Sequence, residues 1–176
     1  MHIVIIGKNH GNRSRWMREL KPMITDPRGF YAESVADPSI GGIRIYMREI
    51  GNEDSQASDV LHVDMSERKS DEEQFIGTCV NRHTAVCVRG YEYITPRLQA
   101  IPDGSSVIMD HLGSMDACYP PFQREVLDLF DRCTVLAAMP DRVPDYLAHV
   151  LKREDVRIFY ADQDSPEEMS SIIKYF

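Results

Sequence analysis

The first twenty residues constrain the fold most, because they read as a strand, a tight turn and a helix in direct succession. Residues 2–6, HIVII, form an apolar run of the kind found in strands buried on both faces, and Gly7 follows them. A polar turn then leads into a basic helix, which we predict over Arg13–Leu20 because Pro22 limits its end. This arrangement is the first half of a β-α-β unit and indicates an α/β fold.

The rest of the chain continues the alternation of strands and helices. Strands are predicted at residues 84–88, 107–109, 134–139 and 156–160, and helices at residues 92–100, 122–130, 143–151 and from 164 onward. A strand-helix alternation favours a mainly parallel sheet with right-handed crossovers. With no internal repeat and no sign of a second domain, we predict one domain over residues 1–176.

A small antiparallel insert interrupts this pattern at about residues 29–64. Residues 29–35 and 43–50 have aromatic and β-branched character, and residues 43, 45 and 47 alternate apolar with polar neighbours. Asp37-Pro38 and Gly41-Gly42 mark the turn between the two strands. A third short strand is predicted at residues 59–64.

Composition narrows the classes of partner. The sequence holds 28 acidic and 20 basic residues, a net charge of −8, which argues against nonspecific binding to nucleic acid or to anionic membranes. No apolar run approaches the roughly 20 residues of a spanning helix, and Met1 leads straight into a strand without a signal peptide. We expect a reduced cytoplasmic protein. Cys79, His83 and Cys87 suggest zinc by their spacing, but they have no obvious fourth ligand.

The turn after Gly7 has the length of a phosphate-binding loop, G-x-x-x-x-G-K-[ST]. Gly7 supplies the first glycine and Ser14 the final hydroxyl, which would suit Mg²⁺. Asn12 replaces the second glycine, adding a side chain where phosphate would lie. Arg13 replaces the lysine, keeping the charge on a larger, planar group. The alternative interpretation is an ordinary strand-turn-helix with a solvated basic face.

A second chemical feature lies at the end of a buried strand. The apolar residues 107–109 lead directly into Asp110. The carboxyl ends of parallel strands form the ligand-binding edge of open α/β sheets. An aspartate there beside a phosphate loop can hold Mg²⁺. The alternative is that Asp110 only caps the following turn.

Three segments together resemble the small P-loop nucleoside-triphosphatases first described from thermophilic microbes. The family has a G-x-x-G-x-G-K-[ST] loop, a G-F-x-[TS]-x-E segment and a strand ending in D-E-[IL]-G-x-M-E. Here the corresponding residues are 7–14, 29–33 (GFYAE) and 110–116 (DHLGSMD), in the same order over nearly the whole chain. The third segment is the most specific, because it is the longest coincidence.

The resemblance implies a three-layer P-loop NTPase-like fold that binds ATP or GTP with Mg²⁺. Ser14 and Asp110 would hold the metal, while Arg13 stands in for the lysine. The residues expected to line the phosphates are Gly7, His10, Gly11, Asn12, Arg13 and Ser14. The family's water-polarising glutamate is His111 here, which would act with Asp110 as a weak catalytic group. Asp116 replaces a second glutamate.

Three hypotheses about function follow. The first is a nucleotide-binding protein that hydrolyses a nucleoside triphosphate weakly or not at all, since Asn12, Arg13 and His111 alter the positions that define hydrolysis. The second is a catalytically inactive P-loop-fold protein that serves as an interaction or regulatory module with a protein partner. The third is a small-molecule kinase, for which the sequence offers no recognisable lid.

Overall fold

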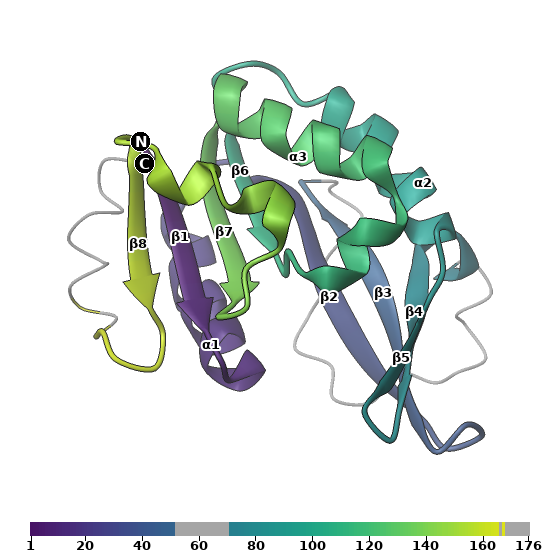
Figure 1. The fold of residues 1–176 in the computed structure, drawn as a ribbon. Coiled ribbons are helices and arrows are strands. Elements are labelled where there is room, and N and C mark those ends of the chain that lie inside the picture. Colours follow the sequence, from purple (N-terminus) through teal and green to yellow (C-terminus); the bar gives the residue numbers. More distant parts are fainter. Residues whose placement is uncertain (52–70, 166, 168–176) are drawn as a thin grey trace.

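A computed structural model describes residues 1–51, 71–165 and 167, which form one eight-stranded sheet covered on both faces (Figure 1). The strand order is β5-β4-β3-β2-β6-β7-β1-β8. The strands are β1 (His2–Gly7), β2 (Arg28–Asp37), β3 (Gly42–Ile50), β4 (Phe75–Val80), β5 (His83–Val86), β6 (Ser106–Asp110), β7 (Thr134–Pro140) and β8 (Val156–Tyr160). The α-helices are α1 (His10–Leu20), α2 (Arg89–Gln99) and α3 (Pro120–Arg132). The short 3₁₀ helices are η1 (Lys21–Met23), η3 (Ser114–Cys118), η4 (Asp145–Leu147) and η5 (Val150–Lys152).

The parallel part of the sheet contains β2, β6, β7, β1 and β8. All four of its strand pairs are parallel, with Val4 opposite Ala137 on one side and Ile158 on the other. Each residue of β1 is buried, which explains the unbroken apolar run at the start of the sequence. The predicted α/β class and mainly parallel sheet are confirmed.

The antiparallel part is built from β2, β3, β4 and β5. Strand β2 belongs to both parts, because it runs parallel to β6 and antiparallel to β3. The predicted hairpin is present, with Asp37 opposite Gly42. Strands β4 and β5 complete this part, although β4 was not predicted. The strand predicted at residues 59–64 lies outside the described residues.

Gly29 allows the two parts of the sheet to meet. It lies opposite Ile108 in the β2–β6 ladder and has a φ of +117°, a region that favours glycine. A Cβ atom at this position would collide with the backbone carbonyl of Ile108. The glycine that begins the GFYAE segment is therefore required by backbone packing.

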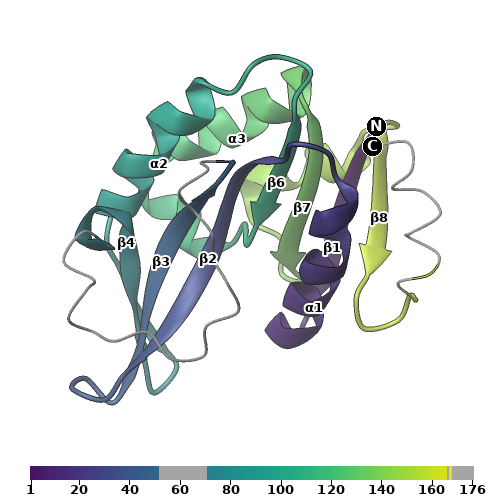
Figure 2. The same cartoon turned by 180° about the vertical axis from the view of Figure 1, so that it is seen from behind.

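Helices α2 and α3 cover one face of the sheet and α1 covers the other, as the two views show (Figures 1 and 2). The larger core lies beneath α2 and α3 and includes Tyr91, Leu98 and Phe122. The smaller core lies beneath α1 and includes Trp16 and Leu136. No helix in the described parts of the chain is long and apolar enough to cross a membrane.

The helix predicted over residues 143–151 is wrong. This segment forms the two 3₁₀ turns η4 and η5 instead. Its apolar spacing arises because Leu147 and Val150 both reach the larger core. The Tyr146 hydroxyl also holds the first turn in place by donating to Asp116. The helix predicted from residue 164 lies almost wholly outside the described residues.

Candidate functional site

The turn between β1 and α1 is shorter than the sequence predicts. Strand β1 ends at Gly7 and α1 begins at His10, so only Lys8 and Asn9 lie between them. The Asn9 side chain caps the helix by accepting from the Gly11 N–H at 2.8 Å. The Arg13 N–H donates to the Asn9 carbonyl. Residues 10–14, expected to line phosphates, therefore form the first turns of α1.

A carboxylate from the same chain, that of Asp162, lies at the opening of this turn. Asp162 follows β8 and lies beside the end of β1, because the Ala161 N–H donates to the Ile6 carbonyl at 2.8 Å. Its carboxylate accepts from the Lys8 N–H and from the Asn12 side-chain amide, both at 2.8 Å. Hydrogen bonds from Asn12 and then from backbone N–H groups lower the pKa of Asp162.

The Asp162 carboxylate is therefore already hydrogen-bonded to N–H groups that could otherwise donate to an anion bound at this turn. Sequence reasoning did not single it out, because Asn12 and Asp162 are 150 residues apart. One signal was available. Asp162 comes just after one parallel strand and Asp110 is the last residue of another, and the carboxyl ends of these strands share one edge.

Arg13 lies in the interior instead of facing an open loop. Arg13 is only 4% exposed, and its guanidinium donates to the Gly7 carbonyl. Desolvation lowers its pKa, and the charges of Asp110, Asp162 and Asp141 act in the opposite direction. Asp110 is the last residue of β6, and Asp162 and Asp141 come just after β8 and β7, respectively. Arg13 therefore compensates negative charge at the ends of neighbouring strands.

Asp110 is the last residue of β6 and His111 follows it, and both side chains are partly buried. Burial raises the pKa of Asp110 to about 6, while the charges of Arg13 and Lys21 act to lower it. His111 has a φ of +87°, and burial lowers its pKa to about 4, with help from His10 and Arg13. A neutral imidazole with so low a pKa is a weak base at neutral pH.

His10 brings α1 next to the end of β6. Its ring centroid lies 5.6 Å from that of His111, with the planes inclined by 53°. Desolvation and then the charge of Arg13 lower the pKa of His10. Its Nδ1 lies 3.3 Å from the Ser14 hydroxyl. Both imidazoles are therefore neutral near pH 7, and the Ser14 hydroxyl is engaged within α1.

Asp116 has a structural role in the DHLGSMD segment. It is 2% exposed and accepts from the Gly113 N–H at 2.8 Å, the Tyr146 hydroxyl at 2.8 Å and the Tyr91 hydroxyl at 3.2 Å. Burial raises its pKa to about 7. This side chain therefore joins η3 to α2 and η4.

A groove runs from the carboxyl ends of the parallel strands toward the antiparallel strands, and we call it the carboxyl-edge groove. Its volume is about 540 Å³. It is lined by His10, Ala32, Ser34, Ile43, Ile45, Cys79, Thr84, His111, Gly113, Ser114, Met115 and Pro140. The walls thus come from α1, from the ends of β6 and β7, from η3 and from all four antiparallel strands.

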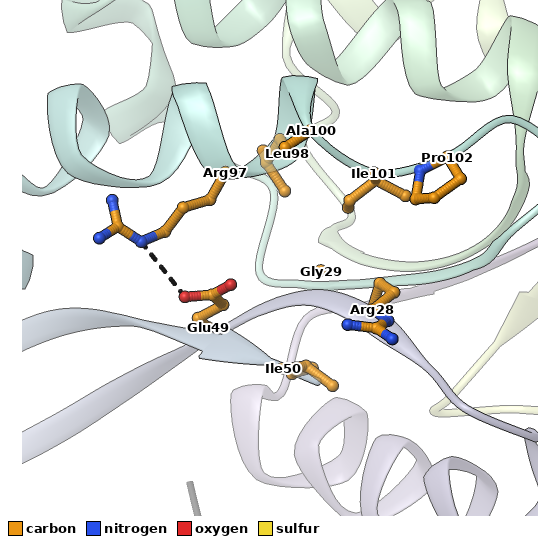
Figure 3. A pocket seen from close by; sticks show the side chains of 9 residues that line it. All are labelled: Arg28, Gly29, Glu49, Ile50, Arg97, Leu98, Ala100, Ile101 and Pro102. Carbon is orange, nitrogen blue, oxygen red and sulfur yellow. Dashed lines mark ion pairs between the residues drawn. The ribbon is translucent and has the colours of Figure 1, made fainter. Parts of the chain in front are cut away.

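A smaller pocket lies at the opposite edge of the sheet (Figure 3). Its volume is about 130 Å³, and it lies between the end of α2, the start of β2 and the end of β3. Glu49 and Arg97 form an ion pair of 3.2 Å across it. Arg97 also packs over the Tyr93 ring and donates to its carbonyl. The charges in this pocket are thus already paired.

The two residues expected to hold Mg²⁺, Ser14 and Asp110, already have polar or charged neighbours within the folded chain. The Ser14 hydroxyl is paired with His10, and Asp110 shares its surroundings with the Arg13 charge. Mg²⁺ requires a near-octahedral set of oxygen ligands. Within residues 1–51, 71–165 and 167, no three His, Cys, Asp or Glu side chains are grouped to bind a metal ion.

These features define a P-loop NTPase-like α/β fold whose β1–α1 turn is short and has the Asp162 carboxylate at its opening. The chain is similar in structure to THEP1 from the hyperthermophile Aquifex aeolicus. The TM-score is 0.60 at 16% identity, over 99% of this chain and 96% of that chain. No protein-family model matches the sequence, and no curated protein matches it. Similarity at this identity establishes the fold and leaves the chemistry to the site.

Proposed function

We propose that this chain is a catalytically inactive P-loop-fold protein that acts as a ligand-binding regulatory module. The observation that carries the proposal is Asp162, whose carboxylate accepts from Lys8 and Asn12 at the mouth of the β1–α1 turn. The N–H groups that could donate to a phosphate group there already donate to Asp162. The phosphate group also meets a negative charge that repels it.

Charge around Arg13 supports the same conclusion. Three carboxylates, Asp110, Asp141 and Asp162, act on this one buried guanidinium. The positive charge that Arg13 could offer to a polyphosphate is therefore offset by these neighbouring carboxylates. Hydrolysis also requires a group that positions the attacking water. His111, with a pKa lowered to about 4, is a weak candidate for that task.

A second candidate function is Mg²⁺-dependent binding of ATP or GTP after Asp162 moves away. The exposure of Asp162 favours it, because the hydrogen bonds that its carboxylate accepts from Lys8 and Asn12 both come from the turn and the start of α1. Ser14 and Asp110 would then supply the metal ligands, and Arg13 would face the phosphates. The N-terminus of α1, beside the ends of β1 and β6, is suitably placed for an anion.

Calorimetric titration with ATP and with GTP, with and without Mg²⁺, separates the two candidates. We expect no binding by the unchanged protein at millimolar nucleotide. Asp162→Ala removes the repelling charge and frees the Lys8 N–H, so its nucleotide affinity should rise on the order of tenfold or more.

Asp164→Ala is the matched control, because Asp164 lies in the same loop but accepts from the Tyr160 N–H at 2.6 Å instead. It should leave nucleotide affinity unchanged. Micromolar, Mg²⁺-dependent binding by the unchanged protein that weakens in Arg13→Ala would refute the proposed function in favour of the second candidate.

A further inference from the structure

We propose that the carboxyl-edge groove binds an uncharged, planar heteroaromatic molecule of about nucleoside size. The inference rests on the proposed function, because a β1–α1 turn that rejects polyphosphate leaves the neighbouring groove to a ligand without charge. The ring system would lie near His10 and His111, with its polar edge toward the hydroxyl groups of the lining.

The absence of charge in the lining selects an uncharged ligand. None of the twelve described residues that line the groove is Asp, Glu, Lys or Arg. The basic side chains among them are His10 and His111, and the pKa of each is lowered. A phosphate or carboxylate buried here would lose its hydration without gaining a partner of opposite charge.

The size and walls of the groove select a compact planar body. A volume of about 540 Å³ lies within the range of about 300–1,000 Å³ that is usual for small-molecule sites. Ile43, Ile45 and Met115 provide apolar surface, and a thioether makes favourable contacts with aromatic rings. The inclined imidazoles of His10 and His111 offer aromatic contacts at one end.

Polar groups in the lining distinguish a heteroaromatic ring from a plain hydrocarbon. Ser34, Thr84 and Ser114 bring hydroxyl groups to the groove. His10 uses Nδ1 toward Ser14, so its Nε2 is the ring nitrogen that Ser14 does not engage. A neutral imidazole both donates and accepts. A ring edge with donors and acceptors, as in a nucleobase or a flavin, matches these groups.

The test compares uncharged compounds with their phosphorylated counterparts. The probes are adenosine with AMP, cytidine with CMP and riboflavin with FMN, titrated into ¹⁵N-labelled protein. At least one uncharged probe should shift the amide signals of Thr84, Gly113 and Met115, and its monophosphate should bind at least tenfold more weakly. If no uncharged probe shifts these signals at 1 mM, or if the monophosphates bind as well, the proposal is wrong.

Substitutions test the location and the role of charge. Met115→Glu should weaken the uncharged probe at least tenfold, whereas Met23→Glu makes the same change on exposed η1 and should have no effect. Thr84→Lys, on the exposed strand β5, should narrow or reverse the preference for the uncharged compound. If Met115→Glu does not fold, Thr84→Asp supplies the acidic test. Unchanged affinity in the folded groove variants refutes the location.

The outcomes separate this inference from the proposed function. Tight binding of ATP with Mg²⁺ at the turn refutes the proposed function, whatever the groove does. Failure of all three uncharged probes refutes the groove ligand and leaves an inactive P-loop-fold protein in place.

Discussion

At the scale of single residues, Asp116 is a carboxylic acid whose titration is strongly changed by burial. It is buried, and its pKa is raised from 3.8 to about 7. The folded state therefore holds this proton over a pH range in which the unfolded chain has released it. The resulting stability is fully present below pH 3.8 and is lost as pH rises through about 7.

Asp116→Asn should remove this pH dependence. An asparagine can accept from Gly113 and Tyr146 with its oxygen while its amide donates to the Tyr91 hydroxyl, so it imitates the protonated acid. The free energy of unfolding of the variant, relative to the unchanged protein, should rise by about 3 kcal/mol between pH 5 and pH 8. Urea denaturation at both pH values measures this difference.

Asp103→Asn serves as the control for that experiment, since the Asp103 side chain is 84% exposed. It should follow the pH dependence of the unchanged protein. A parallel pH dependence in Asp116→Asn itself would mean that Asp116 is ionised in the folded protein throughout this range.

At the scale of elements, periodicity in the sequence predicted most strands and helices but not their tertiary partners. The buried run of β1 and the alternation in β3 are local signals, and both strands form as predicted. The η4–η5 segment has the apolar spacing of a helix because Leu147 and Val150 meet the core from two separate turns. Strand β4 contains Gly77 and depends on pairing with β3, across a register shift, and with β5.

In the candidate site, too, the sequence predicts where residues lie along the sheet but not which distant residues they contact. The placement of Gly7, Ser14 and Asp110 near one sheet edge follows from parallel strand order. The partners of these residues depend on contacts between distant segments. Asp162 meets Asn12 only because β8 lies beside β1 in the sheet. No pattern within ten or twenty residues carries that information.

Helix α2 contains Pro96 in its interior, where proline removes an N–H that would otherwise pair with the Glu92 carbonyl. Side chains satisfy carbonyls on either side of that position, because Thr95 donates to Tyr91 and Arg97 donates to Tyr93. Pro96→Ala should raise the free energy of unfolding by about 1–2 kcal/mol. The gain in helix propensity exceeds the added freedom of the unfolded chain.

Pro120→Ala is the matched control, because Pro120 is the first residue of α3 and that position favours proline. It should leave stability unchanged or slightly lower. Urea midpoints with unchanged slopes provide the comparison. A larger loss of stability in Pro96→Ala than in Pro120→Ala would show that Pro96 fits α2 without strain.

At the scale of the whole molecule, one sheet separates two cores, and the prediction of a single domain requires them to unfold together. Trp16, the single tryptophan of the sequence, lies in the smaller core beneath α1. Leu98 lies in the larger core on the opposite face and is 1% exposed. Its removal tests whether the sheet couples the two faces.

Leu98→Ala should lower the free energy of unfolding by about 3 kcal/mol, because it leaves a cavity in a packed core. Trp16 fluorescence should report the same lowered midpoint as far-ultraviolet circular dichroism, although the cavity lies on the other face. Leu136→Ala, in the core of Trp16 itself, supplies the comparison and should shift both signals equally as well. If Leu98→Ala moves the dichroism midpoint but leaves the Trp16 midpoint unchanged, the two faces unfold separately. The strands shared by both cores make the coupled result the expected one, because β6 and β7 contribute alternate residues to each face.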